Sequence, residues 1–149
     1  MNSEIGETEV VFFDIGDTLA TAAGVDPQGH VILRPLPGVL DILQRLQDAS
    51  LRLGLISNTG DETAASMQRA LTDAGLFEFF AAEPQLLIYS SVVHMKKDSP
   101  EIFRLACARA GLGDNPERCM FVGENSAERA FAMEAGLEVA ATPAGAGDF

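Results

Sequence analysis

The stretch VVFFDIGDT, residues 10–18, decides the fold of this chain. Its four leading apolar residues, with no polar residue between them, are typical of a strand buried on both faces of a parallel sheet. This strand runs directly into Asp14, and Asp17 follows three residues later. Ligands of open α/β sheets bind beyond the carboxyl ends of the strands, so a carboxylate there suits a nucleophile or a metal ligand. The same residue also suits a turn cap, and the stretch alone does not separate these roles.

Apolar strands and amphipathic helices alternate along the rest of the chain. We expect further strands over 51–56, 86–89, 119–122 and 139–141, and helices over 39–48, 61–74, 99–110 and 126–135. Asp61 and Ser99 are the expected caps of the second and third helices. Strands that alternate with helices of this length form βαβ units. We therefore predict an α/β fold, a Rossmann-like three-layer α/β/α sandwich around a mostly parallel five-stranded sheet.

The length of 149 residues predicts one domain over 1–149. A strong turn signal at residues 26–29 lies inside a short insert at about 19–36, which we expect to form a hairpin or flap. This insert is too short to be a large cap domain. The Gly- and Ala-rich segment 143–149 is expected to be mobile.

The composition and charge limit the kinds of partner that the chain is expected to bind. With 22 acidic and 10 basic residues the formal net charge is -12, and no basic cluster exceeds Lys96-Lys97, so nucleic-acid binding is not expected. No apolar run is long enough for a membrane span, and the N-terminus has no signal-peptide core, so we predict a cytoplasmic protein without membrane contact. Cys107 and Cys119 lie in apolar contexts and are expected to be core residues, not a disulfide or a zinc site.

Polar residues follow the expected strands where each one ends. They are Asp14 and Asp17, Ser57 and Asn58, Ser90 and Ser91, and Glu124. Lys97 stands just before a helix. A carboxylate can attack phosphorus, hydroxyl and N–H groups can bind phosphoryl oxygens, a lysine can offset their charge, and further carboxylates can hold Mg²⁺. Together the strand ends predict a phosphoryl-transfer site, although Lys97 taken singly also fits a solvated lysine and Ser57 a turn hydroxyl.

Four segments resemble, in order and spacing, the four motifs of the haloacid dehalogenase (HAD) superfamily. FDIGDTL at 13–19 is similar to the first motif F-D-x-D-G-T-L, and LISN at 55–58 resembles the second. KDSPEIF at 97–103 resembles the third motif K-P-D-P-E-I-F, and FVGENSAE at 121–128 the fourth, F-V-G-D-S-x-x-D. The segments cover nearly the whole chain, so the resemblance implies the fold of a HAD-like hydrolase.

The resemblance also implies roles for single residues. Asp14 is the expected nucleophile, which forms an aspartyl phosphate. Ser57, with the backbone of Asn58, is expected to bind the phosphate oxygens together with Lys97, which offsets their charge. Asp14, the Gly16 carbonyl and Glu124 are the expected Mg²⁺ ligands, and Glu128 is expected to bind the ion directly or through another ligand. The implied activity is that of a Mg²⁺-dependent phosphatase.

Two departures from the motifs bear on this activity. Family phosphatases carry an acid two positions after the nucleophile, where this chain has Gly16; losing general acid–base help costs roughly 10²–10⁴ in rate. Asp17, one position later, is a candidate replacement for that acid. Glu124 and Glu128 stand where Asp is usual, so Mg²⁺ binding is expected to be retained but weakened or shifted, because Mg²⁺ demands near-ideal octahedral geometry.

Three hypotheses follow from these features. The first is an active phosphohydrolase without a large cap; such relatives often act on a bulky or macromolecular phosphorylated substrate, or close their site as a homo-oligomer. The second is a HAD-fold protein with lost or altered hydrolase activity that acts as a binding or regulatory domain. The third, cleavage of a carbon–halogen bond, has only Gly16 in its favour. His30 and His94 are additional candidates for substrate contact, although each also suits an ordinary surface histidine.

Overall fold

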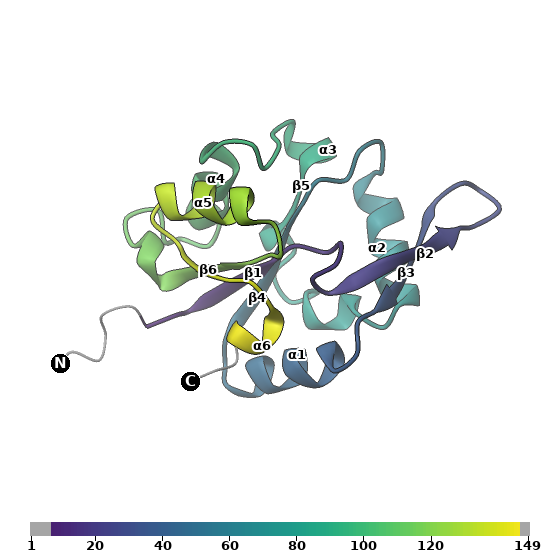
Figure 1. The fold of residues 1–149 in the computed structure, drawn as a ribbon, viewed down its shortest axis with the longest axis horizontal. Helices are drawn as coiled ribbons and strands as arrows, with labels where there is room; N and C mark the ends of the chain where they lie inside the picture. Colours follow the sequence, from purple (N-terminus) through teal and green to yellow (C-terminus); the bar gives the residue numbers. More distant parts are fainter. Residues whose placement is uncertain (1–6, 147–149) are drawn as a thin grey trace.

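The computed structural model of the chain describes residues 7–146 (Figure 1). Its main sheet has five strands in the order β5-β4-β1-β6-β7, and every neighbouring pair is parallel. The strands are β1 (Val10–Phe13), β4 (Arg52–Ser57), β5 (Leu87–Tyr89), β6 (Cys119–Val122) and β7 (Glu138–Ala140). The predicted α/β class with a mostly parallel five-stranded sheet is confirmed, and the buried run that opened the sequence analysis is the central strand.

The four longer helices fall between the strands as the periodicity predicted, whereas the two helices of four residues were not predicted. The helices are α1 (Val39–Asp48), α2 (Ala64–Asp73), α3 (Ser90–Val93), α4 (Glu101–Arg109), α5 (Ser126–Glu134) and α6 (Pro143–Ala146), with 3-10 turns at Phe77–Phe79, Pro84–Leu86 and Pro116–Arg118. Between residues 7 and 146 no helix has both the length and the apolar character needed to cross a membrane.

Three local predictions were wrong. Thr63, not Asp61, caps α2: the Thr63 hydroxyl accepts from the Ser66 N–H and the Ser66 hydroxyl accepts from the Thr63 N–H, a reciprocal box that one carboxylate cannot make. The N-cap of α4 is Pro100, one residue after the predicted Ser99. The start of the predicted mobile tail forms α6, because its Pro143 and Ala146 side chains are buried; residues 147–149 lie outside the described part.

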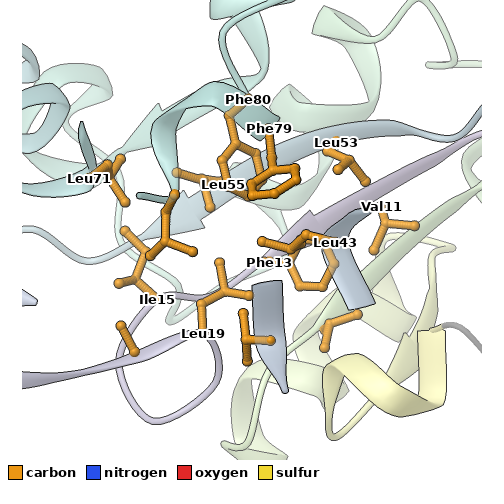
Figure 2. Close-up of a cluster of buried hydrophobic side chains, with 14 of the residues drawn as sticks. Val11, Phe13, Ile15, Leu19, Leu43, Leu53, Leu55, Leu71, Phe79 and Phe80 are labelled. Atoms are coloured by element: carbon orange, nitrogen blue, oxygen red, sulfur yellow. The ribbon is translucent and has the colours of Figure 1, made fainter. Parts of the chain in front are cut away.

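Alternation along β1 builds two hydrophobic cores, one on each face of the sheet. Val11 and Phe13 pack with side chains of α1 and α2, as Figure 2 shows for the cluster around Leu43 and Leu71. Val10 and Phe12 point to the other face and pack with side chains of α4 and α5. Figure 1 accordingly shows α4 and α5 on one side of the sheet and α1 and α6 on the other. These layers fix the strands and thereby the positions of the residues at their ends.

Both cysteines belong to the core, as predicted. Cys107 and Cys119 are buried and not joined in a disulfide, within the cluster that covers the α4 face. Gly54 in β4 is required for packing: a Cβ at this position would lie 2.7 Å from the Leu86 carbonyl oxygen and 2.8 Å from the Phe12 ring.

The segment between β1 and α1 forms an antiparallel hairpin of β2 (Ala20–Val25) and β3 (Val31–Pro35). Its turn is closed by Asp26, whose Oδ1 accepts from the N–H groups of Gln28 and His30, both at 2.9 Å. The His30 bond is the main reason why the pKa of Asp26 is lowered. The hairpin extends from the sheet beside α2 (Figure 1), where His30 Nδ1 lies 3.4 Å from Glu62 Oε1. The organisation of the whole chain as one domain stays a prediction.

Candidate active site

Asp14 stands at the centre of the sheet, directly after β1. Its N–H donates to the Val122 carbonyl oxygen at 2.9 Å, so the backbone is still held against β6, and the residue is buried. Gly123 lets the loop after β6 pass Asp14, because a Cβ at Gly123 would lie 2.8 Å from the Phe121 ring and 3.5 Å from the Asp14 Cβ. The carboxylate therefore sits on rigid backbone.

Lys97 reaches this carboxylate from a distant part of the sequence. Its Nζ donates to Asp14 Oδ1 at 2.6 Å and lies 3.0 Å from Glu128 Oε1, and only 2% of its side chain is exposed. The ammonium also lies 5.6 Å from the centre of the Phe121 ring. A buried charge is tolerated only when it is paired, and here one cation serves two carboxylates. The structure thus brings together three residues that the sequence analysis assigned to one site.

Glu128 is the less satisfied of the two carboxylates. It lies in the first turn of α5, where its N–H donates to Asn125 Oδ1 at 3.0 Å. Although Oε1 is at ion-pair distance from Lys97, the geometry is not that of a hydrogen bond, and this buried oxygen has no hydrogen-bond partner within residues 7–146. A buried acceptor without a donor costs free energy and is a place where an added cation would be favourable.

The segment 55–58, which resembles the second motif, contacts the backbone of Lys97. Ser57 is buried at the end of β4, and the Asn58 side chain accepts a hydrogen bond from the Lys97 N–H at 3.2 Å. Thr59 then binds α3: its N–H donates to Ser90 Oγ at 2.9 Å, and its hydroxyl lies 2.6 Å from Ser91 Oγ. Ser57 and Asn58 therefore line the same strand edge as Asp14.

Three residues that organise the site were missed at the sequence level. The Thr18 hydroxyl accepts from the Glu124 N–H at 3.2 Å and joins the loops after β1 and β6. Arg129 donates to the Gly123 carbonyl oxygen at 2.7 Å, and Thr59 makes the contacts described above. Thr18 and Thr59 directly follow the quoted strand ends and were recognisable by position. Arg129 gave no local signal, because its role depends on the loop before α5.

Four of the expected site residues are exposed, namely Gly16, Asp17, Asn58 and Glu124. The Gly16 backbone lies outside the left-handed region, and a Cβ there would meet nothing within 4 Å, so the chain has room for a side chain at this position. Asp17 takes a left-handed backbone, with φ of 59°, and its N–H donates to the Ala20 carbonyl oxygen. The side chain of Asp17 has no hydrogen-bond or ion-pair partner in the described range. Its role as a replacement acid stays a prediction.

The expected metal ligands are arranged as an incomplete set. Within residues 7–146 no three Asp, Glu, His or Cys side chains gather around one point, and Glu124 is exposed. Asp14 and Glu128 do converge on Lys97, and Oε1 of Glu128, which has this ion pair but no hydrogen bond, is a hard-oxygen donor. Mg²⁺ is commonly held by one or two carboxylates plus water. These donors, with the Gly16 carbonyl, fit Mg²⁺ in chemistry and number.

The fold and site together are a parallel α/β sheet with a buried aspartate–lysine pair at its carboxyl edge. The chain belongs to the haloacid dehalogenase-like hydrolase family, whose pattern matches residues 17–136. In fold it is similar to the crystal structure of a HAD-superfamily hydrolase from Ehrlichia chaffeensis, with a TM-score of 0.70 over 96% of each chain at 14% identity. The family membership that the four motifs implied is confirmed.

Two curated relatives are phosphatases by name. The chain is 30% identical to pyrophosphatase PpaX of Oceanobacillus iheyensis over 105 residues. These matched residues are 70% of this chain and 45% of that protein. It is 26% identical to N-acetylmuramic acid 6-phosphate phosphatase of Pseudomonas aeruginosa over 111 residues. These matched residues are 74% of this chain and 45% of that protein. The chain therefore spans about half the length of the curated relatives it matches.

Proposed function

We propose that this chain is a Mg²⁺-dependent phosphohydrolase that forms an aspartyl phosphate on Asp14. The observation that carries the proposal is the buried contact of 2.6 Å between Lys97 Nζ and Asp14 Oδ1 at the carboxyl end of the central strand. A buried, hydrogen-bonded carboxylate beside a fixed cation is an oriented nucleophile whose target phosphoryl oxygens meet positive charge. The phosphatase names of the two relatives support the same chemistry.

The residues divide the reaction into two steps. An Asp14 carboxylate oxygen attacks the phosphorus of a phosphate ester, and the bond from phosphorus to the leaving oxygen breaks. Lys97 and the Ser57 hydroxyl bind the phosphoryl oxygens while negative charge spreads over them. Water then attacks phosphorus and gives up a proton to solvent, the bond from phosphorus to the Asp14 oxygen breaks, and phosphate leaves the regenerated Asp14 carboxylate. Because residue 16 is glycine, the leaving oxygen takes its proton from Asp17 or from solvent.

Asp14, Glu128 and the Gly16 carbonyl would hold Mg²⁺. When bound, the ion would offset phosphoryl charge and the repulsion between the two carboxylates. Glu124 follows β6 at the same edge, and its longer side chain would have to fold inward to join this set. Since its position is exposed, we propose Glu128 as the more important carboxylate after Asp14.

Thermal unfolding with Mg²⁺ and beryllofluoride tests the proposal without a known substrate, because beryllofluoride mimics an aspartyl phosphate. At about 100 times its dissociation constant the ligand should stabilise the protein by about 2.7 kcal/mol, or roughly 5–10 °C. Asp14→Asn should abolish the shift. Asp41→Asn, which removes an exposed carboxylate from α1, is the matched control and should keep it.

A second candidate function rests on Gly16. A chain without the usual acid can keep the fold and bind a partner instead of hydrolysing an ester. If the beryllofluoride shift is missing from the wild-type protein and Mg²⁺ alone also has no effect, the phosphohydrolase proposal is contradicted and this second function is favoured. Asp14→Asn would then leave the biological activity unchanged.

A further inference from the structure

A hollow of about 470 Å³ lies between the loop after β4 and α3, next to the backbone of Lys97, and has no role in the steps above. Asn58 and Gly60 after β4 line one wall, and residues of α3 and the loop after it line the other, with Ser90, His94 and Lys96 among them. The volume falls in the range of roughly 300–1,000 Å³ that is usual for small-molecule sites. We call this space the α3 hollow.

The α3 hollow shares a wall with the candidate active site. Asn58 lines the hollow, and its side chain also accepts a hydrogen bond from the Lys97 N–H at 3.2 Å. Lys96, on the hollow side, is the next residue in the chain. Because Asn58 borders both the hollow and Lys97, we take the hollow as the space for the part of the substrate that is attached to a phosphoryl group bound at Asp14.

The groups that face the α3 hollow favour an anion. Lys96 and Lys97 are the only lysines in a chain of net charge -12. Lys97 is used by Asp14 and Glu128, whereas Lys96 and His94 have no ion-pair partner within residues 7–146, and no carboxylate lines the hollow. A cation without a partner in so acidic a chain gives a local positive field that attracts negative groups.

The two serines and the His94 backbone of the α3 hollow are held in place by hydrogen bonds. Ser90 Oγ accepts from the Thr59 N–H, and Ser91 Oγ contacts the Thr59 hydroxyl. His94 takes a left-handed backbone, with φ of 58°, and its N–H donates to the Ser90 carbonyl oxygen at 2.9 Å. Non-glycine residues in this conformation are uncommon and persist where the surroundings fix them. The wall is thus a shaped surface, not a loose loop.

Resting on the proposed function, we propose that the α3 hollow binds a second anionic group, a carboxylate or a second phosphate, on the leaving group of the substrate. Lys96 supplies the charge and His94 an additional hydrogen-bond donor. The substrate class is then a small phosphate ester with two anionic ends. This differs from the bulky or macromolecular substrate that the resemblance implied, because a cation without an ion-pair partner beside a hollow of this volume suits a compact dianion.

A pair of matched esters tests this inference without relying on turnover. 3-Phosphoglycerate and glycerol 3-phosphate differ only in a carboxylate that replaces a hydroxymethyl group. In isothermal titration with Asp14→Asn protein and Mg²⁺, the carboxylate ester should bind about tenfold more tightly, as expected for one hydrogen bond to a charged group. Adding Lys96→Gln should abolish this preference. Arg45→Gln removes an exposed cation from α1 and should preserve it.

The outcomes separate this inference from the proposed function. Equal binding of both esters, or an equal loss of both in Lys96→Gln, would overturn the α3 hollow as an anion site, as would a phosphopeptide that binds better than either ester. A retained preference without a beryllofluoride shift in the wild-type protein would support the anion site and contradict the phosphohydrolase. In an active enzyme, Lys96→Gln should lower kcat/KM for 3-phosphoglycerate and leave p-nitrophenyl phosphate unchanged.

Discussion

The ion pairs at the two ends of the central strands differ in exposure and in the number of carboxylates that each cation contacts. At the amino end, Arg52 at the start of β4 binds both carboxylate oxygens of Glu83, at 2.8 and 2.7 Å, and Arg118 before β6 binds Glu9 before β1 at 2.7 Å. Each cation there has one carboxylate, and their arginine side chains are each 31% exposed. At the carboxyl end, one lysine with 2% exposure faces two carboxylates.

This difference separates pairs that support the fold from a cluster suited to chemistry. Balanced pairs near water change stability little, whereas a buried cluster with an excess carboxylate is costly unless a ligand completes it. The buried side-chain polar atoms without hydrogen bonds in the described range, Tyr89 Oη and Glu128 Oε1, also belong to the carboxyl end. Local imbalance of this kind is expected at functional sites.

The largest expected effect concerns catalysis at the carboxyl end, where Gly16 stands in place of the usual acid. Gly16→Asp should raise the hydrolysis rate of alkyl phosphates by roughly 10²–10⁴, because it restores a general acid where a side chain has room. p-Nitrophenyl phosphate should gain much less, since its leaving group needs little protonation. Steady-state kinetics on both esters measures the effect. An equal gain on both would show that the new carboxylate does not act as the acid.

Removing the shared cation should break the carboxyl-end cluster. Lys97→Met leaves Asp14 and Glu128 buried with no cation between them, so we expect a loss of about 3–5 kcal/mol in the free energy of unfolding, together with loss of activity. Urea denaturation measures the loss. Mg²⁺ should restore more stability to Lys97→Met than to the wild-type protein. A fully stable variant would mean that the cluster is not strained.

The amino-end pair should respond weakly and in a pH-dependent way. Arg52→Gln should cost about 1 kcal/mol, because the pair is partly exposed. The hydrogen bond from Arg52 lowers the pKa of Glu83, so the pair stabilises the fold above the ordinary glutamate pKa and loses this effect as the pH falls through the lowered value. Denaturation between pH 7 and 3 should therefore show wild type and Arg52→Gln converging in acid. A constant difference would contradict the assignment.

The smallest expected effect is a gain in stability at the carboxyl end. Tyr89→Phe removes a buried hydroxyl without a partner and should stabilise the fold by about 0.5–1 kcal/mol. Burial raises the pKa of Tyr89 to about 12, so the wild-type fold loses stability as the pH rises from the ordinary value of 10.0 to that range, whereas Tyr89→Phe does not. Because Tyr89 is the only tyrosine and the chain has no tryptophan, its absorbance titration reports the phenol directly.

The sequence by itself determined the sheet, the family and the positions of the strand-end residues. Apolar runs and helical periodicity are local signals, and parallel topology forces the ends of neighbouring strands to one edge. Asp14 and Ser57 were therefore recognisable as strand-end residues, whereas Lys97 was recognised from its place before a helix and from the resemblance of residues 97–103 to the third motif. The hairpin turn at Asp26 was equally local, because its side chain bonds backbone only two and four residues away.

Only the tertiary structure decided how these residues meet. The contact from Lys97 to Asp14 spans 83 residues, and the exposure of Glu124, the contact from Arg129 to Gly123 and the α3 hollow depend on how separate loops pack. Asp and Thr are both common helix caps, so the sequence did not decide between Asp61 and Thr63. Thr63 caps α2 because it forms reciprocal hydrogen bonds with Ser66. Periodicity says which face of an element is buried, but the partner across the interface and the charge left unpaired are set when all the elements have packed together.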